Sequence, residues 1–311
     1  MTLALIHHES SLGHVEPPGH PERVDRIRAV AAALEDERFA NLHRVEARPA
    51  DDALLRLAHP QRHIDRIRAA IPQEGGAMLD SDTYLSPGSL DAALHGAGAA
   101  AQAVDMVLDG DVRAAFVAMR PPGHHAEPEK PMGFCLFANA AIAALHALEN
   151  RGLSRVAVVD FDVHHGNGTQ AVLWDEGRAT FCSSHQWPLY PGTGAESETG
   201  AHGNVHNAGL RPGSGGPQFR AAWENRLLPA VAAAAPELII VSAGFDAHHR
   251  DPLAELNLVE ADFAWITHRI CDLAETCAEG RVVSVLEGGY DLVGLAVSTA
   301  AHVQALMERS L

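Results

Sequence analysis

Six short apolar runs recur along this chain, and each has the length of a single β-strand. Most are continuous rather than alternating, which is typical of strands buried on both faces of a parallel sheet. The runs cover residues 3–6, 114–119, 155–159, 179–183, 238–242 and 282–286. Because such a sheet needs helices on both sides, the runs predict an α/β fold with a central, predominantly parallel sheet flanked by helices.

The segments between the runs supply the expected helices. Ala-rich stretches of helical length lie at residues 90–108, 138–149, 218–235 and 260–278. Gly- and Pro-rich stretches interrupt the pattern without low complexity, so they indicate loops rather than domain boundaries. With 311 residues, the chain is long enough for one large core, and we expect a single domain over residues 1–311.

Polar clusters follow four of the apolar runs. They are RPPGHH at 120–125, DFDVHHGNG at 160–168, AGFDAHH at 243–249 and EGGYD at 287–291. Parallel sheets bind ligands outside the carboxyl ends of their strands. The four clusters are therefore expected to converge on one site, although no single cluster would be sufficient evidence for it.

The cluster at 160–168 offers ligands for a metal ion. In an extended chain Asp160, Asp162 and His164 point to one face, while His165 points to the other. A mixed carboxylate and imidazole set suits zinc or another borderline divalent ion. A polar turn that closes a buried strand is the alternative, but ionisable groups there are costly to desolvate unless they bind something. With Asp246 as a third ligand, the set leaves a coordination position open, as catalytic zinc sites do.

The remaining clusters supply acid–base and oxyanion chemistry. His124 and His125 follow a rigid Pro-Pro-Gly turn and are candidates to accept a proton from water and deliver one to a leaving amine. Tyr290 follows a Gly-Gly turn that permits close backbone approach, and its hydroxyl is a candidate donor to an oxyanion. Purely structural roles, in rigid or capped turns, are the alternatives. The simplest interpretation of this set is a metal-assisted amide hydrolase.

Composition sets wider limits. A formal charge of −17 argues against direct binding of nucleic acids. No stretch of 18 apolar residues suggests a membrane span, and the first residues lack the pattern of a signal peptide. The four cysteines lie in mostly apolar surroundings, which indicates reduced residues of the core or of helices. We therefore expect a soluble cytoplasmic protein with no membrane association, and a homo-oligomer remains open.

Several motifs in register resemble the histone deacetylase superfamily, specifically its class II and bacterial deacetylase-like amidohydrolase branch. They are RPPGHHA at 120–126, GFC at 133–135, DFDVHHGNGTQ at 160–170, AGFDAH at 243–248, LEGGYD at 286–291, GHPERVDRI at 19–27 and YPGTG at 190–194. The resemblance implies an arginase-like fold around a sheet of about eight parallel strands. It also implies zinc-dependent removal of acetyl, or other acyl, groups from acyl-lysine in proteins or peptides.

The resemblance gives the zinc ligands, tandem histidines and tyrosine the roles already described and adds supporting residues. Asp160 matches the carboxylate that orients His124, and Asn167 takes the position that contacts His125. A structural potassium ion is also implied, bound around Asp160, Asp162, His164 and Ser183. One zinc ion and one potassium ion are therefore the expected cofactors.

The resemblance also implies a narrow tunnel for the acylated side chain. Gly133 and Phe134 in the GFC motif and Tyr190 match its walls. Leu253 takes a position at which lysine deacetylases of class II carry leucine and some polyamine deacetylases carry glutamate. Without that carboxylate the site favours an acyl-lysine over a cationic polyamine.

Two residues are expected at the rim of the site. Asp82 lies near the position where relatives hold the substrate backbone, and His20 falls in the GHPERVDRI motif near the entrance.

Three functional alternatives stay open. Small N-acetylated amines such as acetylpolyamines are alternative substrates for the same chemistry. A manganese-dependent ureohydrolase shares the fold but needs more carboxylates than this chain offers. A non-catalytic acyl-lysine-binding module is disfavoured because no ligand, tandem histidine or tyrosine is missing.

Overall fold

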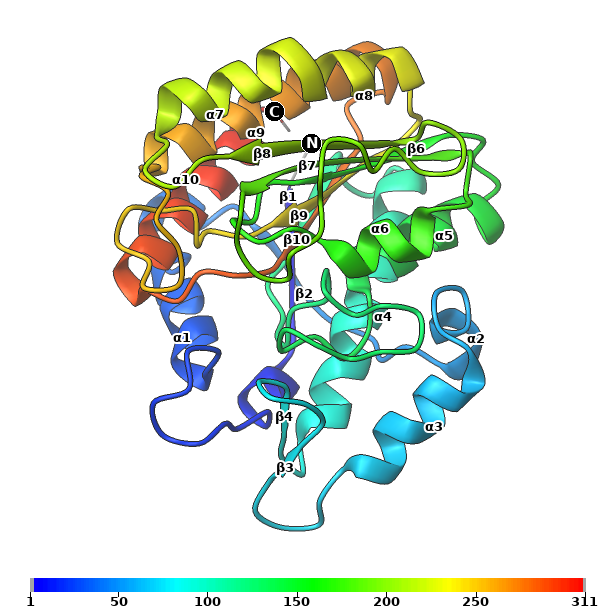
Figure 1. Ribbon diagram of the computed structural model, residues 1–311, viewed down its shortest axis with the longest axis vertical. Coiled ribbons are helices and arrows are strands. Elements are labelled where there is room, and N and C mark those ends of the chain that lie inside the picture. The colour runs from blue at the N-terminus through cyan, green and yellow to red at the C-terminus, as the bar shows by residue number, and fades with distance from the viewer. Residues whose placement is uncertain (1–2, 310–311) are drawn as a thin grey trace.

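An eight-stranded, entirely parallel sheet organises the molecule (Figure 1), as seen in a computed structural model that describes residues 3–309. In sheet order the strands are β2 (His43–Glu46), β1 (Leu3–His7), β5 (Ala114–Val117), β10 (Val282–Leu286), β9 (Ile239–Ala243), β6 (Val156–Asp160), β7 (Ala179–Gln186) and β8 (Val205–Leu210). A separate antiparallel pair is formed by β3 (Ala77–Met78) and β4 (Tyr84–Leu85). The parallel sheet confirms the predicted fold class.

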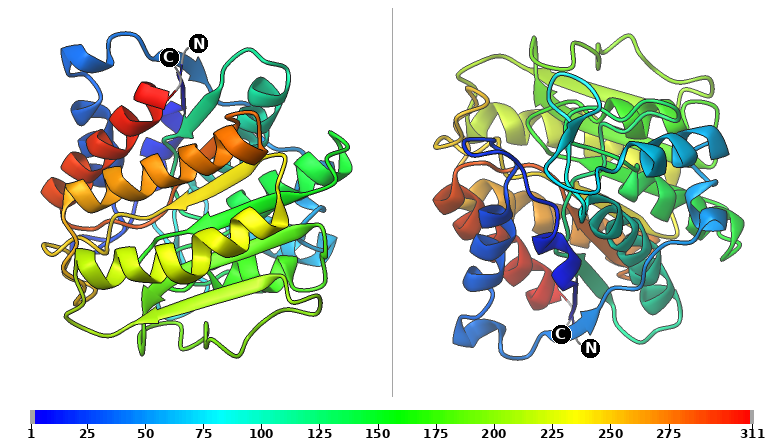
Figure 2. Two further views of the ribbon diagram at one scale, coloured as in Figure 1. Left: turned by 90° about the horizontal axis from the view of Figure 1, so that it is seen from above. Right: turned by 90° about the horizontal axis from the view of Figure 1, so that it is seen from below.

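Helices cover both faces of this sheet (Figure 2). The helices that pack into the core of one face are α2 (Asp52–Leu55), α3 (Gln61–Ala70), α4 (Ser89–Leu108), α5 (Asn139–Glu149) and α6 (Asn167–Leu173). The elements of the opposite face are α1 (Val24–Ala33), α7 (Gly216–Ala222), the π-helical turn η3 (Trp223–Leu227), α8 (Leu228–Ala234), α9 (Glu260–Cys277) and α10 (Leu292–Arg309). Two short 3₁₀ turns, η1 (Glu9–Leu12) and η2 (Glu37–Phe39), complete the chain order.

The two cores explain why the predicted strands are continuous apolar runs. In β6, Val156 and Val158 pack with the core on the α4 and α5 side, while Ala157 and Val159 pack with the core on the α9 and α10 side. All four side chains are almost fully buried. Successive residues of a strand point to opposite faces, so a strand covered on both faces has no polar position to spare.

The six predicted runs correspond to β1, β5, β6, β7, β9 and β10. The sequence did not reveal the two edge strands of the parallel sheet, β2 and β8, or the short pair β3 and β4. Strand β2 is exposed or half-buried along its whole length, and β8 combines four buried residues with the half-buried His206 and the exposed Gly209. Edge strands are covered less completely, so neither appears as an apolar run.

The order of the central strands brings the four polar clusters together. Strands β5, β10, β9 and β6 are consecutive neighbours in the sheet. These are the strands that the four clusters follow, and all run in the same direction, so all four carboxyl ends open on one edge. Along residues 3–309, no helix combines the length and the apolarity that a membrane crossing requires.

Candidate metal and catalytic site

Three buried side chains form a compact candidate metal-binding group. Asp162 and His164 follow β6, and Asp246 follows the neighbouring strand β9. One ligand atom from each lies within 4.8 Å of the other two. His164 Nδ1 is 3.2 Å from Asp162 Oδ1 and 3.1 Å from Asp246 Oδ2. The distances are short enough for a single ion to contact all three atoms.

Backbone N–H groups donate to the remaining carboxylate oxygens of this candidate metal-binding group. Gly288 N–H donates to Asp162 Oδ2 at 2.8 Å, and Val163 N–H donates to Asp246 Oδ1 at 2.9 Å. Burial opposes a charge on His164, but its hydrogen bonds to the two carboxylates raise its pKa to about 10. The pair of carboxylates thus attracts positive charge to the place where a metal ion would bind, and the donor set fits zinc.

The ligands converge by a different local geometry from the one predicted. Strand β6 ends at Asp160, and residues 161–166 form an irregular segment with bends at residues 162–164 rather than a continued strand. Asp160 Oδ1 accepts from Asp162 N–H at 3.0 Å, and Asp162 Oδ1 accepts from His164 N–H at 2.9 Å. Each aspartate therefore folds the chain over its own side chain, as short carboxylates often do. The predicted extended strand through residues 160–164 is therefore wrong, although Asp162 and His164 do lie close together as predicted.

The tandem histidines lie beside the metal group, and each has a distinct partner. His124 Nδ1 is 2.9 Å from Asp160 Oδ2, and His124 Nε2 is 3.8 Å from Asp162 Oδ1. His125 Nδ1 is 2.8 Å from Asn167 Oδ1. The orientation of the Asn167 amide is fixed, because its nitrogen donates to Glu127 Oε1 at 2.8 Å. His125 Nδ1 must therefore carry the hydrogen.

Burial and neighbouring charges shift the pKa values of the two histidines in opposite directions. Burial opposes a charge on His124, but the Asp162 and Asp160 carboxylates outweigh it and raise its pKa well above the ordinary value. Burial, reinforced by His124, lowers the pKa of His125 well below that value.

His165 faces elsewhere and bonds through both ring nitrogens, to Thr193 Oγ1 and Gln170 Oε1.

Tyr290 is buried on the turn that follows β10. The Arg26 guanidinium lies 4.8 Å from its ring centroid, and the Phe134 ring lies edge-on at 5.8 Å. Burial raises the pKa of the Tyr290 hydroxyl well above its usual range, so that hydroxyl keeps its proton at neutral pH. A side chain added at Gly288 would meet Asp246 Oδ2 at 2.1 Å, which explains the glycine in this turn.

Residues expected at the tunnel and rim gather around the tandem histidines. The Tyr190 ring stands edge-on to His125, with centroids 5.3 Å apart. Gly133 has a φ of 56°, and a Cβ there would lie 2.4 Å from the His125 ring. Gly133 N–H donates to Asp82 Oδ1 at 3.3 Å, and His20 Nε2 is 3.3 Å from Asp82 O. Asp82 and His20, the two residues predicted at the rim, therefore both lie next to the GFC motif.

Two further predicted residues occupy supporting positions. Leu253 is half-buried, and its N–H donates to Asp251 Oδ1, while Asp251 Oδ2 accepts from Tyr290 N–H at 2.7 Å. Ser183 pairs with Asp160 in the register of β6 and β7, and its hydroxyl is 3.0 Å from His185 Nδ1.

Sequence reasoning missed a set of buried charges that support the site. Arg120 uses all five of its N–H groups, on Glu22, Glu16 and the carbonyls of Ser11 and His14. Glu287 is fully buried, and it accepts from the backbone of the tandem-histidine segment. Arg120 and Glu287 each directly follow an apolar run. The same signal that identified the other site residues could therefore have identified these two.

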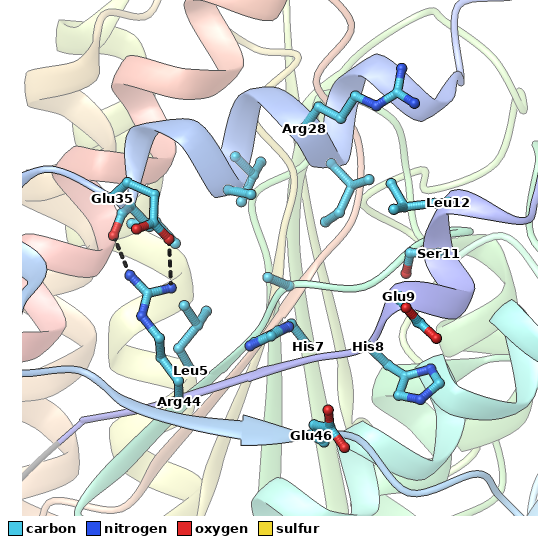
Figure 3. A pocket seen from close by; sticks show the side chains of 15 residues that line it. Leu5, His7, His8, Glu9, Ser11, Leu12, Arg28, Glu35, Arg44 and Glu46 are labelled. Atoms are coloured by element: carbon cyan, nitrogen blue, oxygen red, sulfur yellow. Dashed lines mark hydrogen bonds and ion pairs between the residues drawn. The ribbon is translucent and has the colours of Figure 1, made fainter.

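A cavity of about 600 Å³ lies elsewhere, between α1, η1, β1 and β2 (Figure 3). Its lining includes none of the predicted site residues. At one end Arg44 pairs with Glu35, and the lining combines buried residues such as Leu5 and Val30 with exposed ones. The candidate site is therefore the group at the carboxyl edge of the sheet rather than this cavity.

Comparisons with known proteins agree with that location. Residues 20–306 match the family described as the histone deacetylase domain. A histone deacetylase-like amidohydrolase of Pseudomonas aeruginosa is 40% identical over 89% of this chain and 75% of its own length. A probable deacetylase of Archaeoglobus fulgidus is 35% identical over 99% of this chain and 86% of its own length.

The three-dimensional comparison gives the same result. The crystal structure of the HDA15 HD domain superposes with a TM-score of 0.93 at 34% identity, covering 99% of this chain and 88% of that one. The eight-stranded parallel sheet is thus the arginase and deacetylase fold. The chain therefore belongs to the histone deacetylase family and is a deacetylase, a hydrolase of amide bonds.

Proposed function

We propose that this protein is a zinc-dependent deacylase that removes acetyl, or other acyl, groups from acyl-lysine in proteins and peptides. One observation carries the proposal: three convergent ligand atoms lie beside two histidines with different hydrogen-bond partners and a buried, protonated tyrosine. Residues 1–311 would act as one catalytic domain. The four free cysteines support a reducing, cytoplasmic location.

Asp162, His164 and Asp246 would hold the zinc ion. When bound, zinc supplies a Lewis acid for water and for the amide carbonyl of the substrate. A structural potassium ion would bind around Asp160, Asp162, His164 and Ser183. The side-by-side pairing of Asp160 and Ser183 in β6 and β7 supports that second site.

His125 would act as the general base and then as the general acid. Because its Nδ1 hydrogen is committed to Asn167, its Nε2 is free to accept a proton from water. The lowered pKa keeps that nitrogen unprotonated before the reaction. After the water oxygen has attacked the carbonyl carbon, the same proton passes to the departing nitrogen as the C–N bond breaks. The products are a carboxylic acid and an amine, which at neutral pH become a carboxylate and an ammonium when the second water proton moves from the acid to the amine.

His124 and Tyr290 would stabilise charge rather than move the first proton. Asp160 holds His124 through Nδ1 and favours its charged form. The Tyr290 hydroxyl would donate to the carbonyl oxygen as negative charge develops there. Phe134 and Tyr190 would flank the acyl chain, and Asp82 and His20 would meet the substrate at the rim.

Acetate release from a fluorogenic acetyl-lysine peptide tests the proposal. Purified protein supplied with zinc should release acetate, and Tyr290→Phe should lower kcat by about 100- to 1,000-fold because one oxyanion donor is lost. The zinc content of the variant should equal that of the wild type. Tyr84→Phe in the β3–β4 hairpin is the matched control, and its activity should match the wild type.

Two results would contradict parts of the proposal. Unchanged turnover in Tyr290→Phe would exclude the tyrosine as oxyanion donor. A panel of acetyl-lysine peptides, longer acyl-lysines and acetylpolyamines tests the substrate class, because Leu253 offers no carboxylate to a distal ammonium. A tenfold preference for an acetylpolyamine, about 1.4 kcal/mol of transition-state free energy, would reverse that assignment.

A further inference from the structure

Glu287 is a buried carboxyl group with no part in the mechanism proposed above. It comes directly after β10, and its side chain is completely buried. Its Oε2 accepts from Gly123 N–H at 2.7 Å and from His124 N–H at 3.1 Å. Its Oε1 accepts from Ser242 Oγ at 3.1 Å. No arginine or lysine contacts this carboxyl group among residues 3–309, so its contacts are hydrogen bonds rather than ion pairs.

The turn that begins at Glu287 contacts the tandem-histidine segment and one carboxylate of the candidate metal site, and it carries Tyr290. Its first side chain holds the backbone of His124, and Gly288 N–H holds the carboxylate of Asp162. Tyr290 follows two residues later. A movement of this turn would therefore displace the tandem histidines, a metal-binding carboxylate and the tyrosine together.

A chain of hydrogen bonds and ion pairs fixes the turn from the other side. Arg26 donates to the carbonyl oxygens of Glu287 and Gly289 at 2.5 and 2.6 Å. Arg26 also donates to Glu22 at 3.0 Å, and Glu22 binds Arg120, which opens the RPPGHH segment. The contacts thus close a ring that runs from the histidine segment through Glu287 and Arg26 and back.

We infer that Glu287 is a positioning residue, which sets the distance between the His124–His125 segment and the Tyr290 turn by accepting the Gly123 and His124 N–H groups. The inference rests on the proposed deacylation. Both N–H groups are buried and find their acceptor in this carboxyl group, so removing it leaves two unsatisfied donors beside the reacting groups. A displacement of about 1 Å in a catalytic group is enough to lower turnover by about 100-fold.

Glutamine separates hydrogen bonding from charge at this position. Burial raises the pKa of Glu287 to about 7, so the carboxyl group is partly neutral at physiological pH. In Glu287→Gln the amide oxygen still accepts from Gly123 and His124, and the amide nitrogen can donate to Ser242 Oγ. Glu287→Ala removes the acceptor altogether.

Steady-state kinetics on the zinc-loaded full chain test the inference. Glu287→Ala should lower kcat by about 100-fold with KM within about threefold of the wild type, whereas Glu287→Gln should stay within about threefold in both. Both variants should retain the wild-type zinc content. If Glu287→Ala does not fold, Glu287→Asp, which withdraws the acceptor by one methylene, should lower kcat by about tenfold.

Asp262 provides the matched control. It is also a buried carboxylate that accepts from a backbone N–H, at Val259 before α9, but it is separate from the site and, unlike Glu287, also pairs with Arg220. Asp262→Ala should lower the melting temperature without changing kcat.

Each contrary result has its own meaning. Wild-type kcat in Glu287→Ala overturns the inference, as does a loss of zinc from that variant, which would make Glu287 a support of the metal site. Equal damage in the Gln and Ala variants would assign the effect to charge and overturn positioning by hydrogen bonds. If the wild type itself releases no acetate, the proposed function fails instead.

Discussion

Two buried clusters in this molecule have nearly the same chemistry. Asp162, His164 and Asp246 form one, and His14, Glu16 and Glu22 form the other. Each combines two carboxyl groups and one imidazole, with ligand atoms no more than 4.8 Å apart. The donor atoms alone therefore do not distinguish a metal site from a structural ionic cluster.

The difference lies in the cation that each cluster already contains. Arg120 Nη2 donates to both Glu16 and Glu22 at 2.5 Å, so a guanidinium occupies the position between the carboxylates. Burial opposes charge on Glu22, but Arg120 outweighs it and holds its pKa well below the ordinary value. In the Asp162 cluster the only cationic contacts made by residues 3–309 come from the protonatable rings of His164 and His124. A buried acidic cluster is a candidate metal site when the chain supplies no permanent cation to it.

Replacing Asp246 is the strongest test of this comparison. Asp246→Ala should lower kcat/KM by about 1,000-fold or more, equivalent to about 4 kcal/mol, because a metal ligand is lost. Added zinc should also stabilise the wild type, by about 2.7 kcal/mol at 100 times its Kd, but not the variant. Acetate release and thermal unfolding with and without zinc measure the two effects.

The other cluster provides the control for the zinc response. Glu16→Gln should leave the zinc-induced rise in melting temperature intact, since Arg120 already neutralises that cluster. Loss of the rise in Glu16→Gln, or its persistence in Asp246→Ala, would mean that the two clusters had been assigned the wrong way round.

Removing the built-in cation should have the next largest effect. Arg120→Met leaves Glu16 and Glu22 buried without their partner, which should lower the free energy of unfolding by about 3–5 kcal/mol. Urea denaturation at neutral pH measures the loss. Arg62→Met, which breaks an exposed pair with Glu129, is the matched control and should leave the urea midpoint nearly unchanged.

A double change makes the Arg120 test sharper. Adding Glu22→Gln to Arg120→Met removes one of the stranded charges and should restore part of the lost stability. If the double variant is no more stable than Arg120→Met, the cost arises from lost packing rather than from unpaired charge.

The sequence alone predicted one of these two clusters and not the other. Asp162, His164 and Asp246 follow apolar strands, and parallel strands end at one edge, so their convergence could be anticipated. Glu22 and Arg120 are 98 residues apart, and Glu22 precedes a helix rather than following a strand. Their pairing depends on how the loop before α1 packs against the end of β5, which no local pattern encodes.

The same limit applies to the rest of the fold. The six strands covered on both faces were visible as apolar runs, whereas the edge strands β2 and β8 were not. Glu287 stood in a quoted motif, but its role depends on the adjacency of β10 and β5, which are far apart in sequence. Sequence therefore identified the chemistry of the site better than the contacts that hold it.

His59 shows a third way to bury a polar group, which is to keep it neutral. It gives the prediction with the smallest expected change in the free energy of unfolding. Its Nδ1 is 3.1 Å from Pro128 O, and its Nε2 accepts from Ala138 N–H at 2.9 Å, so a second proton would face another N–H. Burial, with His63 stacked beside it, lowers its pKa to about 3. The His59 imidazole of the unfolded chain takes up a proton near pH 6.5, whereas that of the folded chain does not. The contribution of neutral His59 to the free energy of unfolding is therefore complete above about pH 6.5 and is lost as pH falls toward about 3. At about pH 5 the loss should be about 2 kcal/mol.

His59→Gln, which stays neutral, should be less stable at about pH 7 but should lose less stability than the wild type between about pH 6.5 and 5. Urea denaturation of both proteins across this range measures the difference, and parallel slopes would show that His59 takes up its proton in the folded state.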